Sequence, residues 1–216
     1  THAHYDDDAF NEDRDEIIKK MYESGVICVL NASSNISSST KSVSLAQRYD
    51  FIYAAVGVHP HDAQEADDDT IPALTRLASD RKVVAIGEIG LDYYYDNSPR
   101  DIQKQWFIRQ INLARDLKLP IIIHDRESHE DAMNIVKSEG AASVGGIFHC
   151  FSGSIEMARD VLKNNFHIAV GGSLTFKNAK RPVEVVEYVP MDRLLLETDC
   201  PYMTPHPFRG RRNDST

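Results

Sequence analysis

Short apolar runs alternate with amphipathic stretches along the whole chain. Seven strand-like runs begin near residues 26, 52, 83, 120, 144, 167 and 194. Between these runs, apolar residues recur every three or four positions, as on the buried side of a helix. In 101–117, for example, Trp106, Phe107 and Ala114 belong to such a pattern. The alternation predicts an α/β protein with a parallel sheet and crossover helices.

Further helical patterns occupy the other segments between the predicted strands. We expect helices around residues 10–21, 41–49, 71–77, 128–136, 155–162 and 182–189. Asp6–Asp8 and Asp67–Asp69 precede two of them, where acidic groups favour a helix N-terminus. We therefore expect both acidic runs to cap helices at a solvated surface and not to hold a metal. Ser128 is a further predicted N-cap.

Most of the predicted strands end in the same chemistry, a His, Asp or Glu followed by turn residues. Glu88 follows the run 82–86, His124 follows 120–123 and His149 follows 144–148. A charged group at the end of a buried strand is costly unless something compensates it. One such residue can simply reach solvent, but the repetition favours a shared site.

The number of strands distinguishes between two α/β architectures. Seven recognisable runs and a short strand at the His2–His4 end make eight, which favours a TIM (β/α)8 barrel formed by residues 1–216 as a single domain. An open doubly wound sheet would more naturally carry a Gly-rich phosphate loop after its first strand, and no such loop is visible. In a barrel, catalytic groups lie where the strands end.

Six strand-end residues carry the candidate chemistry. They are His2, His4, Glu88, His124, His149 and Asp199. This set is too large for one tetrahedral metal centre with an open position, but it suffices for two ions that share a ligand. Glu88 is the candidate bridge because a carboxylate offers two oxygens. The nitrogen-rich set suits Zn, Mn, Co or Ni better than Mg, which prefers oxygen.

A metal pair of this kind activates a water molecule and stabilises both oxygens at a phosphoryl centre. Asp199, a ligand and also a carboxylate, is the candidate acceptor of the water's proton, so Asp199 and Glu88 are the candidate catalytic residues. The same water could attack an amide or an aminoacyl ester. A binding protein that only keeps the barrel is a third hypothesis.

Net charge and cysteine count restrict the kinds of partner and the cellular compartment that we expect. The formal charge of −9 argues against a broad nucleic-acid-coating surface but leaves room for a local anion site. No apolar run approaches the ~20 residues that span a bilayer, and no leader is visible. The odd cysteine count, with Cys28, Cys150 and Cys200, favours reduced thiols in a cytoplasm. No obligate protein partner is inferred.

Several motifs together resemble the TatD family of metal-dependent hydrolases, which belongs to the amidohydrolase-like barrels. They are His2-Ala3-His4, Gly57-Val58-His59-Pro60-His61, Gly87-Glu88-Ile89-Gly90-Leu91-Asp92-Tyr93, Ile123-His124-Asp125-Arg126, His149-Cys150-Phe151-Ser152-Gly153 and Glu197-Thr198-Asp199-Cys200-Pro201-Tyr202. Each motif alone is weak, but the set is specific and follows the family's order over essentially the whole chain. Relative to that family we expect the barrel to be trimmed at both ends, before the His pair and after Thr216.

The resemblance implies a binuclear site and a deoxyribonuclease. It assigns His2, His4, Glu88 and Asp199 to one metal and Glu88, His124 and His149 to the other. It also implies divalent-metal-dependent cleavage of DNA, with exonuclease action on single strands.

Candidate substrate contacts surround the proposed ligands. His61 and Arg126 stand at strand ends, where they either bind a phosphate oxygen or stay solvated. Arg209 belongs to the concentrated basic run 209–212, which is either plain surface or a guide for a polyanion. Tyr93 is a candidate for stacking on bases, whereas we expect Tyr94 and Tyr95 to pack at the rim.

Overall fold

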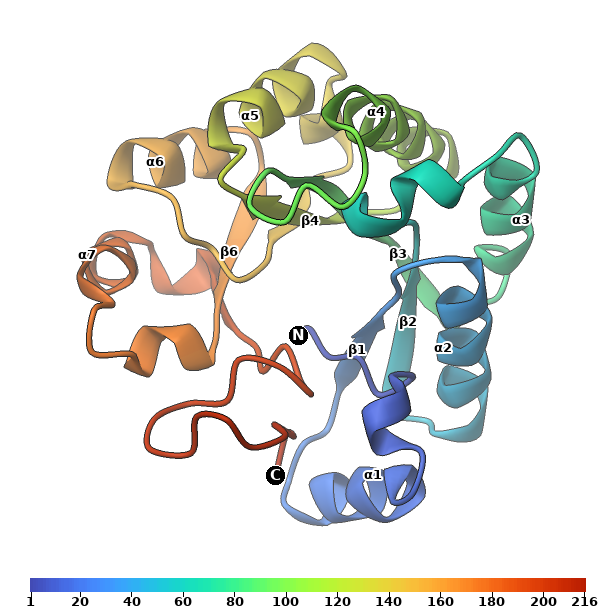
Figure 1. Cartoon of the computed structure of the whole chain (residues 1–216), viewed down its shortest axis with the longest axis vertical. Coiled ribbons are helices and arrows are strands. Elements are labelled where there is room, and N and C mark those ends of the chain that lie inside the picture. Colours follow the sequence, from blue (N-terminus) through green and yellow to red (C-terminus); the bar gives the residue numbers. More distant parts are fainter.

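A ring of helices surrounds a curled parallel sheet in the computed structural model, which describes residues 1–216 (Figure 1). The seven strands pair in chain order, each with the next. They are β1 (Val29–Ala32), β2 (Ile52–Val56), β3 (Val83–Asp92), β4 (Ile121–Arg126), β5 (Gly146–Phe148), β6 (Phe166–Val170) and β7 (Leu194–Leu196). The helices between them are α1 (Arg14–Glu23), α2 (Ile36–Arg48), α3 (Thr70–Leu77), α4 (Arg100–Leu117), α5 (His129–Ser138), α6 (Ile155–Lys163) and α7 (Lys180–Tyr188).

The N-terminal segment takes the place of an eighth strand. Ala3 forms parallel bridges to Asn31 of β1 on one side and to Cys200, beyond β7, on the other. The first residues therefore lie between the two edges of the sheet, near the centre of the ring (Figure 1). The predicted TIM-barrel architecture is confirmed. At the His2–His4 end, where we expected a short strand, only the isolated bridges of Ala3 are formed.

Side chains of the strands alternate between two apolar clusters. Ala32, Ala55, Ala85 and Ile122 pack with one another in a small cluster between the strands. Their neighbours along the strands, such as Ile86, belong to the large core that also contains the helices' buried residues. Because side chains two residues apart share a face of a strand, His124 lies on the inner face together with Ile122.

Glu88 reaches the inner face through an irregularity in β3. The pairing of β3 with β4 slips between Ile86 and Ile89, so that β3 holds one extra residue there. Strict alternation would place residue 88 on the outer face with Ile86, and a bulge re-aims the side chain. The turn expected directly after Glu88 is absent, since β3 continues to Asp92.

Two helix and strand boundaries differ from the prediction. Helix α2 begins at Ile36, not near residue 41, and Asn35 caps it by accepting a hydrogen bond from Ser38 N. Its first turns bury serines, which an apolar periodicity does not register. Strand β1 begins at Val29 because Ile27 is 82% exposed and lies outside the sheet.

Two capping predictions are confirmed only in part. Asp6 is buried, and its carboxylate accepts hydrogen bonds from Asn31 at 2.7 Å and Ser38 at 2.5 Å. This network ties the N-terminal segment to β1 and α2. The neighbouring Asp7 does cap the turn Asp8–Phe10. Ser128 occupies the N-cap position of α5 without a capping hydrogen bond, because its hydroxyl interacts with Leu91 O and with Asp125.

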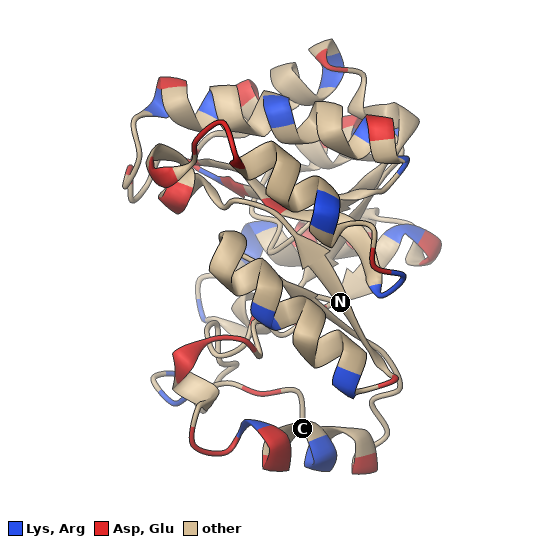
Figure 2. Cartoon of the chain, turned by 90° about the vertical axis from the view of Figure 1, so that its right-hand side faces the viewer, with Lys and Arg blue, Asp and Glu red and all other residues tan.

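Acidic and basic residues are interspersed over the outer helices of the side drawn in Figure 2. None of the helices combines the length and the hydropathy that crossing a bilayer requires.

Candidate metal centre

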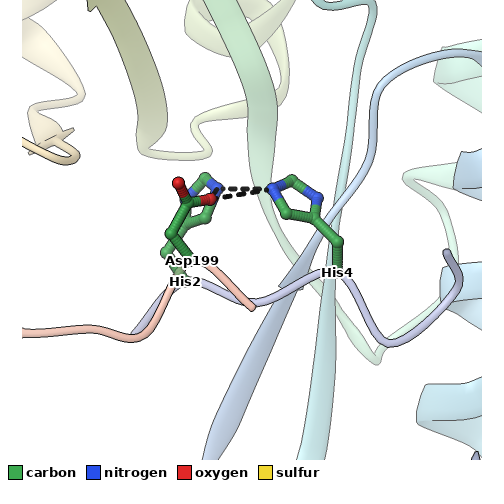
Figure 3. Close-up of side chains that lie close together, drawn as sticks. All are labelled: His2, His4 and Asp199. Atoms are coloured by element: carbon green, nitrogen blue, oxygen red, sulfur yellow. Dashed lines mark hydrogen bonds and ion pairs between the residues drawn. The ribbon is translucent and has the colours of Figure 1, made fainter. Parts of the chain in front are cut away.

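All six predicted strand-end residues meet inside the barrel. His2 and His4 come from the N-terminal segment, Glu88 from β3, and His124 from β4, while His149 and Asp199 follow β5 and β7. Figure 3 shows His2, His4 and Asp199 converging from opposite ends of the chain. Their ligand atoms all lie within 4.8 Å of one another.

The Glu88 carboxylate faces two groups of donors with its two oxygens. Oε2 lies 3.1 Å from His2 Nε2 and 3.6 Å from His4 Nε2. Oε1 lies 2.8 Å from His124 Nδ1 and 2.8 Å from His149 Nε2. Asp199 Oδ1 joins the first group, 3.3 Å from His4 Nε2. Glu88 thus stands between the two halves of the cluster.

The hydrogen bonds at the outer edges of two rings decide which nitrogen is free to act as a ligand. His4 Nδ1 lies 2.9 Å from the carbonyl oxygen of Ala32, which only accepts, so this nitrogen carries a proton. His124 Nε2 donates in the same way to Asp92 at 3.0 Å. In the neutral rings, His4 Nε2 and His124 Nδ1 therefore point lone pairs into the cluster. Metal-binding histidines typically donate their second N–H to such an acceptor.

His2 and His149 stack on each other with ring centroids 3.9 Å apart. Their Nδ1 atoms are buried without a hydrogen-bond partner, although Glu197 Oε1 lies 3.5 Å from His149 Nδ1. His2 Nε2 and His4 Nε2 face each other at 3.1 Å. Lone pairs and carboxylate oxygens that converge in this way need a cation between them. The donor set therefore fits divalent metal ions.

Burial and opposite charge act against each other in the cluster. Burial by itself raises the pKa of Glu88, but the surrounding histidines hold the pKa of this carboxyl well below its usual range. For His4, burial lowers the pKa, and the Asp199 hydrogen bond and the nearby carboxylates raise it to about 9. Without a metal, the same attraction that favours a cation raises the pKa of His4, His124 and His149, whereas burial lowers the pKa of His2.

The sequence analysis missed His59, which lies beside Glu88. His59 Nε2 is 3.4 Å from Glu88 Oε1, while its Nδ1 accepts a hydrogen bond from His61 N. Burial lowers the pKa of His59 to about 4, so the ring is neutral and carries its proton on Nε2. In this tautomer His59 directs an N–H at Glu88 Oε1 across 3.4 Å. With the other tautomer, His59, Glu88 and His124 form a further group that could hold a metal ion. Its position directly after the strand-like run 51–58 was the signal that could have identified it.

Asp92 at the end of β3 was also missed. Its buried carboxylate interacts with His124 Nε2 at 3.0 Å and His61 Nε2 at 2.9 Å, and it accepts hydrogen bonds from Tyr94 N and Tyr95 N. Burial raises the pKa of Asp92, but these hydrogen bonds lower it further, so the group is ionised. An acidic residue at a strand end was again the available signal.

The four candidate substrate-contact residues lie in different surroundings. His61 is anchored by Asp92 close to the cluster. Arg126 ends β4 and extends over two tyrosine rings. Tyr93 donates its hydroxyl to Asp131 at 2.6 Å, which turns its polar end away from the histidines. Arg209 is exposed and lies over the Phe176 ring.

Comparison with known proteins agrees with this geometry. Residues 1–216 match the family of TatD related DNases along their whole length. The chain belongs to this family. It is 49% identical over 214 residues to an uncharacterized metal-dependent hydrolase, YabD, of Bacillus subtilis, covering 99% of this chain and 84% of that protein.

Two further TatD relatives are informative. The chain is 34% identical to a protein of Cronobacter sakazakii named 3'-5' ssDNA/RNA exonuclease TatD, with 95% of this chain and 80% of that protein covered. The crystal structure of YjjV, a TatD homologue from Escherichia coli, superposes with a TM-score of 0.92 and 31% identity, covering 100% of this chain and 83% of the other. The chain is accordingly a metal-dependent hydrolase of the TatD family, with candidate metal-binding groups inside its barrel.

Proposed function

We propose that this chain is a two-metal phosphodiesterase that removes nucleotides from single-stranded DNA. One observation carries the proposal: the two oxygens of Glu88 face two separate sets of free histidine nitrogens. His2, His4, Asp199 and Glu88 Oε2 would hold one divalent cation, and His124, His149 and Glu88 Oε1 the other. The nitrogen-rich set favours Zn, Mn, Ni or Co over Mg.

Bound metal ions of this kind polarise a phosphoryl oxygen and make a water molecule a nucleophile at neutral pH. Asp199 is the proposed proton acceptor for that water. Its Oδ1 faces the histidines, while Oδ2 has no hydrogen bond within the chain and is free to accept. The neutral His59 lies 3.4 Å from Glu88 Oε1, next to the His124 ring, and helps to hold this carboxylate in its position.

The relatives and the cationic side chains beside the cluster support the proposed substrate class. A TatD relative is named as an exonuclease of single-stranded DNA and RNA. His61, Arg126, Tyr93 and Arg209 are the proposed substrate contacts, with the arginines directed at phosphate. The three cysteines are free thiols, which fits the proposed cytoplasmic location.

A labelled single-stranded oligonucleotide tests the proposal. In the presence of Zn²⁺ or Mn²⁺, wild type should shorten it from one end, and Glu88→Gln and His124→Ala should each lower kcat/KM more than about a hundred-fold. Glu130→Gln, an exposed glutamate on α5, should retain the wild-type rate. Wild-type rates in both ligand variants would contradict the proposal. A higher kcat/KM for a small amide or aminoacyl ester than for the oligonucleotide would favour amidohydrolase or esterase activity instead.

A further inference from the structure

Two neighbouring tyrosines stand exposed where β3 ends. Tyr94 and Tyr95, which we expected to pack at the rim, are 55% and 54% exposed. Their rings meet edge to face with centroids 4.9 Å apart.

The Arg126 guanidinium lies over both rings. Its central carbon is 4.3 Å from the Tyr94 centroid and 4.8 Å from the Tyr95 centroid. Arg126 forms no ion pair, whereas Arg100 and Arg48 each pair with an aspartate. In a chain of net charge −9, an unpaired arginine attracts anions to this point of the surface. We call Tyr94, Tyr95 and Arg126 the aromatic platform.

The aromatic platform is held in place from below. The buried Asp92 carboxylate accepts hydrogen bonds from Tyr94 N at 3.0 Å and Tyr95 N at 2.9 Å. Arg126 O accepts a third, from Tyr93 N. The backbone that carries the two rings is therefore ordered before any ligand arrives, which lowers the entropic cost of binding.

The aromatic platform also adjoins the candidate metal centre. The Tyr95 ring packs edge to face on His61 with centroids 5.4 Å apart. The His61 ring in turn lies 4.4 Å from His59 and 6.1 Å from His124. One imidazole therefore separates the exposed rings from the residues around Glu88, so a strand of nucleic acid can contact both at once.

We propose that the aromatic platform is a binding subsite for single-stranded nucleic acid: a base stacks on Tyr94 or Tyr95, and Arg126 binds the adjoining phosphate. Every base has a face that stacks on an aromatic ring, so this contact does not depend on sequence. Paired bases in a duplex hide these faces, so the subsite selects single strands. The inference rests on the proposed function, because the subsite would bind the strand that is cleaved at the cluster around Glu88.

Binding to matched oligonucleotides tests the subsite separately from catalysis. The probes are two fluorescein-labelled single strands of equal length with non-cleavable phosphorothioate linkages, one carrying adenine at each position and one abasic throughout. Affinity is measured by fluorescence anisotropy with the metal-loaded protein. Wild type should bind the base-carrying strand about ten-fold more tightly than the abasic one.

The variants assign that preference to particular side chains. Tyr94→Ala combined with Tyr95→Ala should remove the ten-fold preference and leave abasic binding unchanged, while both Tyr→Phe changes should retain it. Arg126→Ala should weaken binding of both strands. The matched control is Arg159→Ala with Tyr188→Ala, an arginine–tyrosine pair at the surface between α6 and α7, which should change neither affinity.

Three outcomes would overturn the subsite: equal wild-type affinity for both strands, an unchanged preference after both Tyr→Ala changes, or its loss in the Tyr→Phe variants. These outcomes are independent of cleavage. If the protein shows the base preference but hydrolyses no natural oligonucleotide, the subsite proposal stands and the proposed nuclease function is wrong.

Discussion

Nε2 of His124 lies 3.0 Å from the buried Asp92 carboxylate, while Nδ1 of the same ring lies 2.8 Å from Glu88. Because Asp92 accepts the proton on Nε2, it directs the lone pair of Nδ1 into the cluster. Carboxylates placed in this way raise the basicity of a ligating histidine and fix its orientation. Asp92 is thus a positioning residue for the proposed second metal.

Asp92→Asn should weaken metal binding by about 10–100-fold. The asparagine oxygen still accepts from Tyr94 N and Tyr95 N, but its amide group can only donate toward His61 and His124, which disfavours the required tautomer. Isothermal titration with Zn²⁺ measures the loss. Asp96→Asn, an exposed change in the same loop where Asp96 pairs with Arg100, should leave the affinity unchanged. Equal Zn²⁺ affinities of Asp92→Asn and wild type would contradict the positioning role of Asp92.

Gly90→Ala should disrupt both the fold and the site. Gly90 has φ +143°, and an added Cβ would lie 1.9 Å from the backbone oxygen of His124. The backbone conformation alone costs about 1–3 kcal/mol for a non-glycine residue, and the collision adds to that. Gly25→Ala is the matched control, with φ +95° and nothing within 4 Å. Thermal unfolding should show a much larger fall in Tm for Gly90→Ala, together with weaker metal binding; similar falls in the two variants would contradict the close approach.

Metal removal should destabilise the wild-type protein. A chelator removes the metal ions, so that no cation separates the carboxylate oxygens and imidazole lone pairs that converge around Glu88. Returning a divalent ion to about one hundred times its Kd should restore about 2.7 kcal/mol, or roughly 5–10 °C in Tm for a chain of this size. His4→Ala should respond much less, since it lacks one of the four ligands proposed for the metal ion at Glu88 Oε2. If neither the chelator nor Zn²⁺ changes the Tm of the wild-type protein, the metal centre would be contradicted.

The pair His129–Asp125 should make stability depend on pH. His129 Nδ1 lies 2.7 Å from Asp125 Oδ2, and this hydrogen bond is the main reason why the pKa of His129 is raised above 6.5. Since the folded state holds the proton more tightly, the contribution is complete below the unfolded pKa and is lost as pH rises through the raised pKa.

The measurement is the difference in unfolding free energy between wild type and His129→Gln, in which titration of the other histidines cancels. The difference should stay below about 1 kcal/mol because a third of the ring is in solvent. It should be larger near pH 6 than near pH 9. A difference that grows with rising pH would contradict the assignment.

The sequence by itself determined the alternation of strands and helices and the residues at the strand ends. Both are local properties, because apolar periodicity and the residue that follows a strand can be identified within one segment. The six ligand candidates were found in this way, and they do meet inside the barrel. The sequence does not show the register of β3. The extra residue near Glu88 nevertheless decides which way the Glu88 carboxylate points.

Only the tertiary structure decided the roles of the residues around those six. His59 and Asp92 stand at strand ends like the ligand candidates, but their contacts with Glu88 and His124 reach residues that are distant in sequence. The contact with Asp92 decides which nitrogen of His124 carries a proton. Asp6 belongs to an acidic run that looks solvated, yet it is buried against Asn31 and Ser38. Protonation and burial depend on neighbours that the folded chain brings together, so a linear pattern does not specify them.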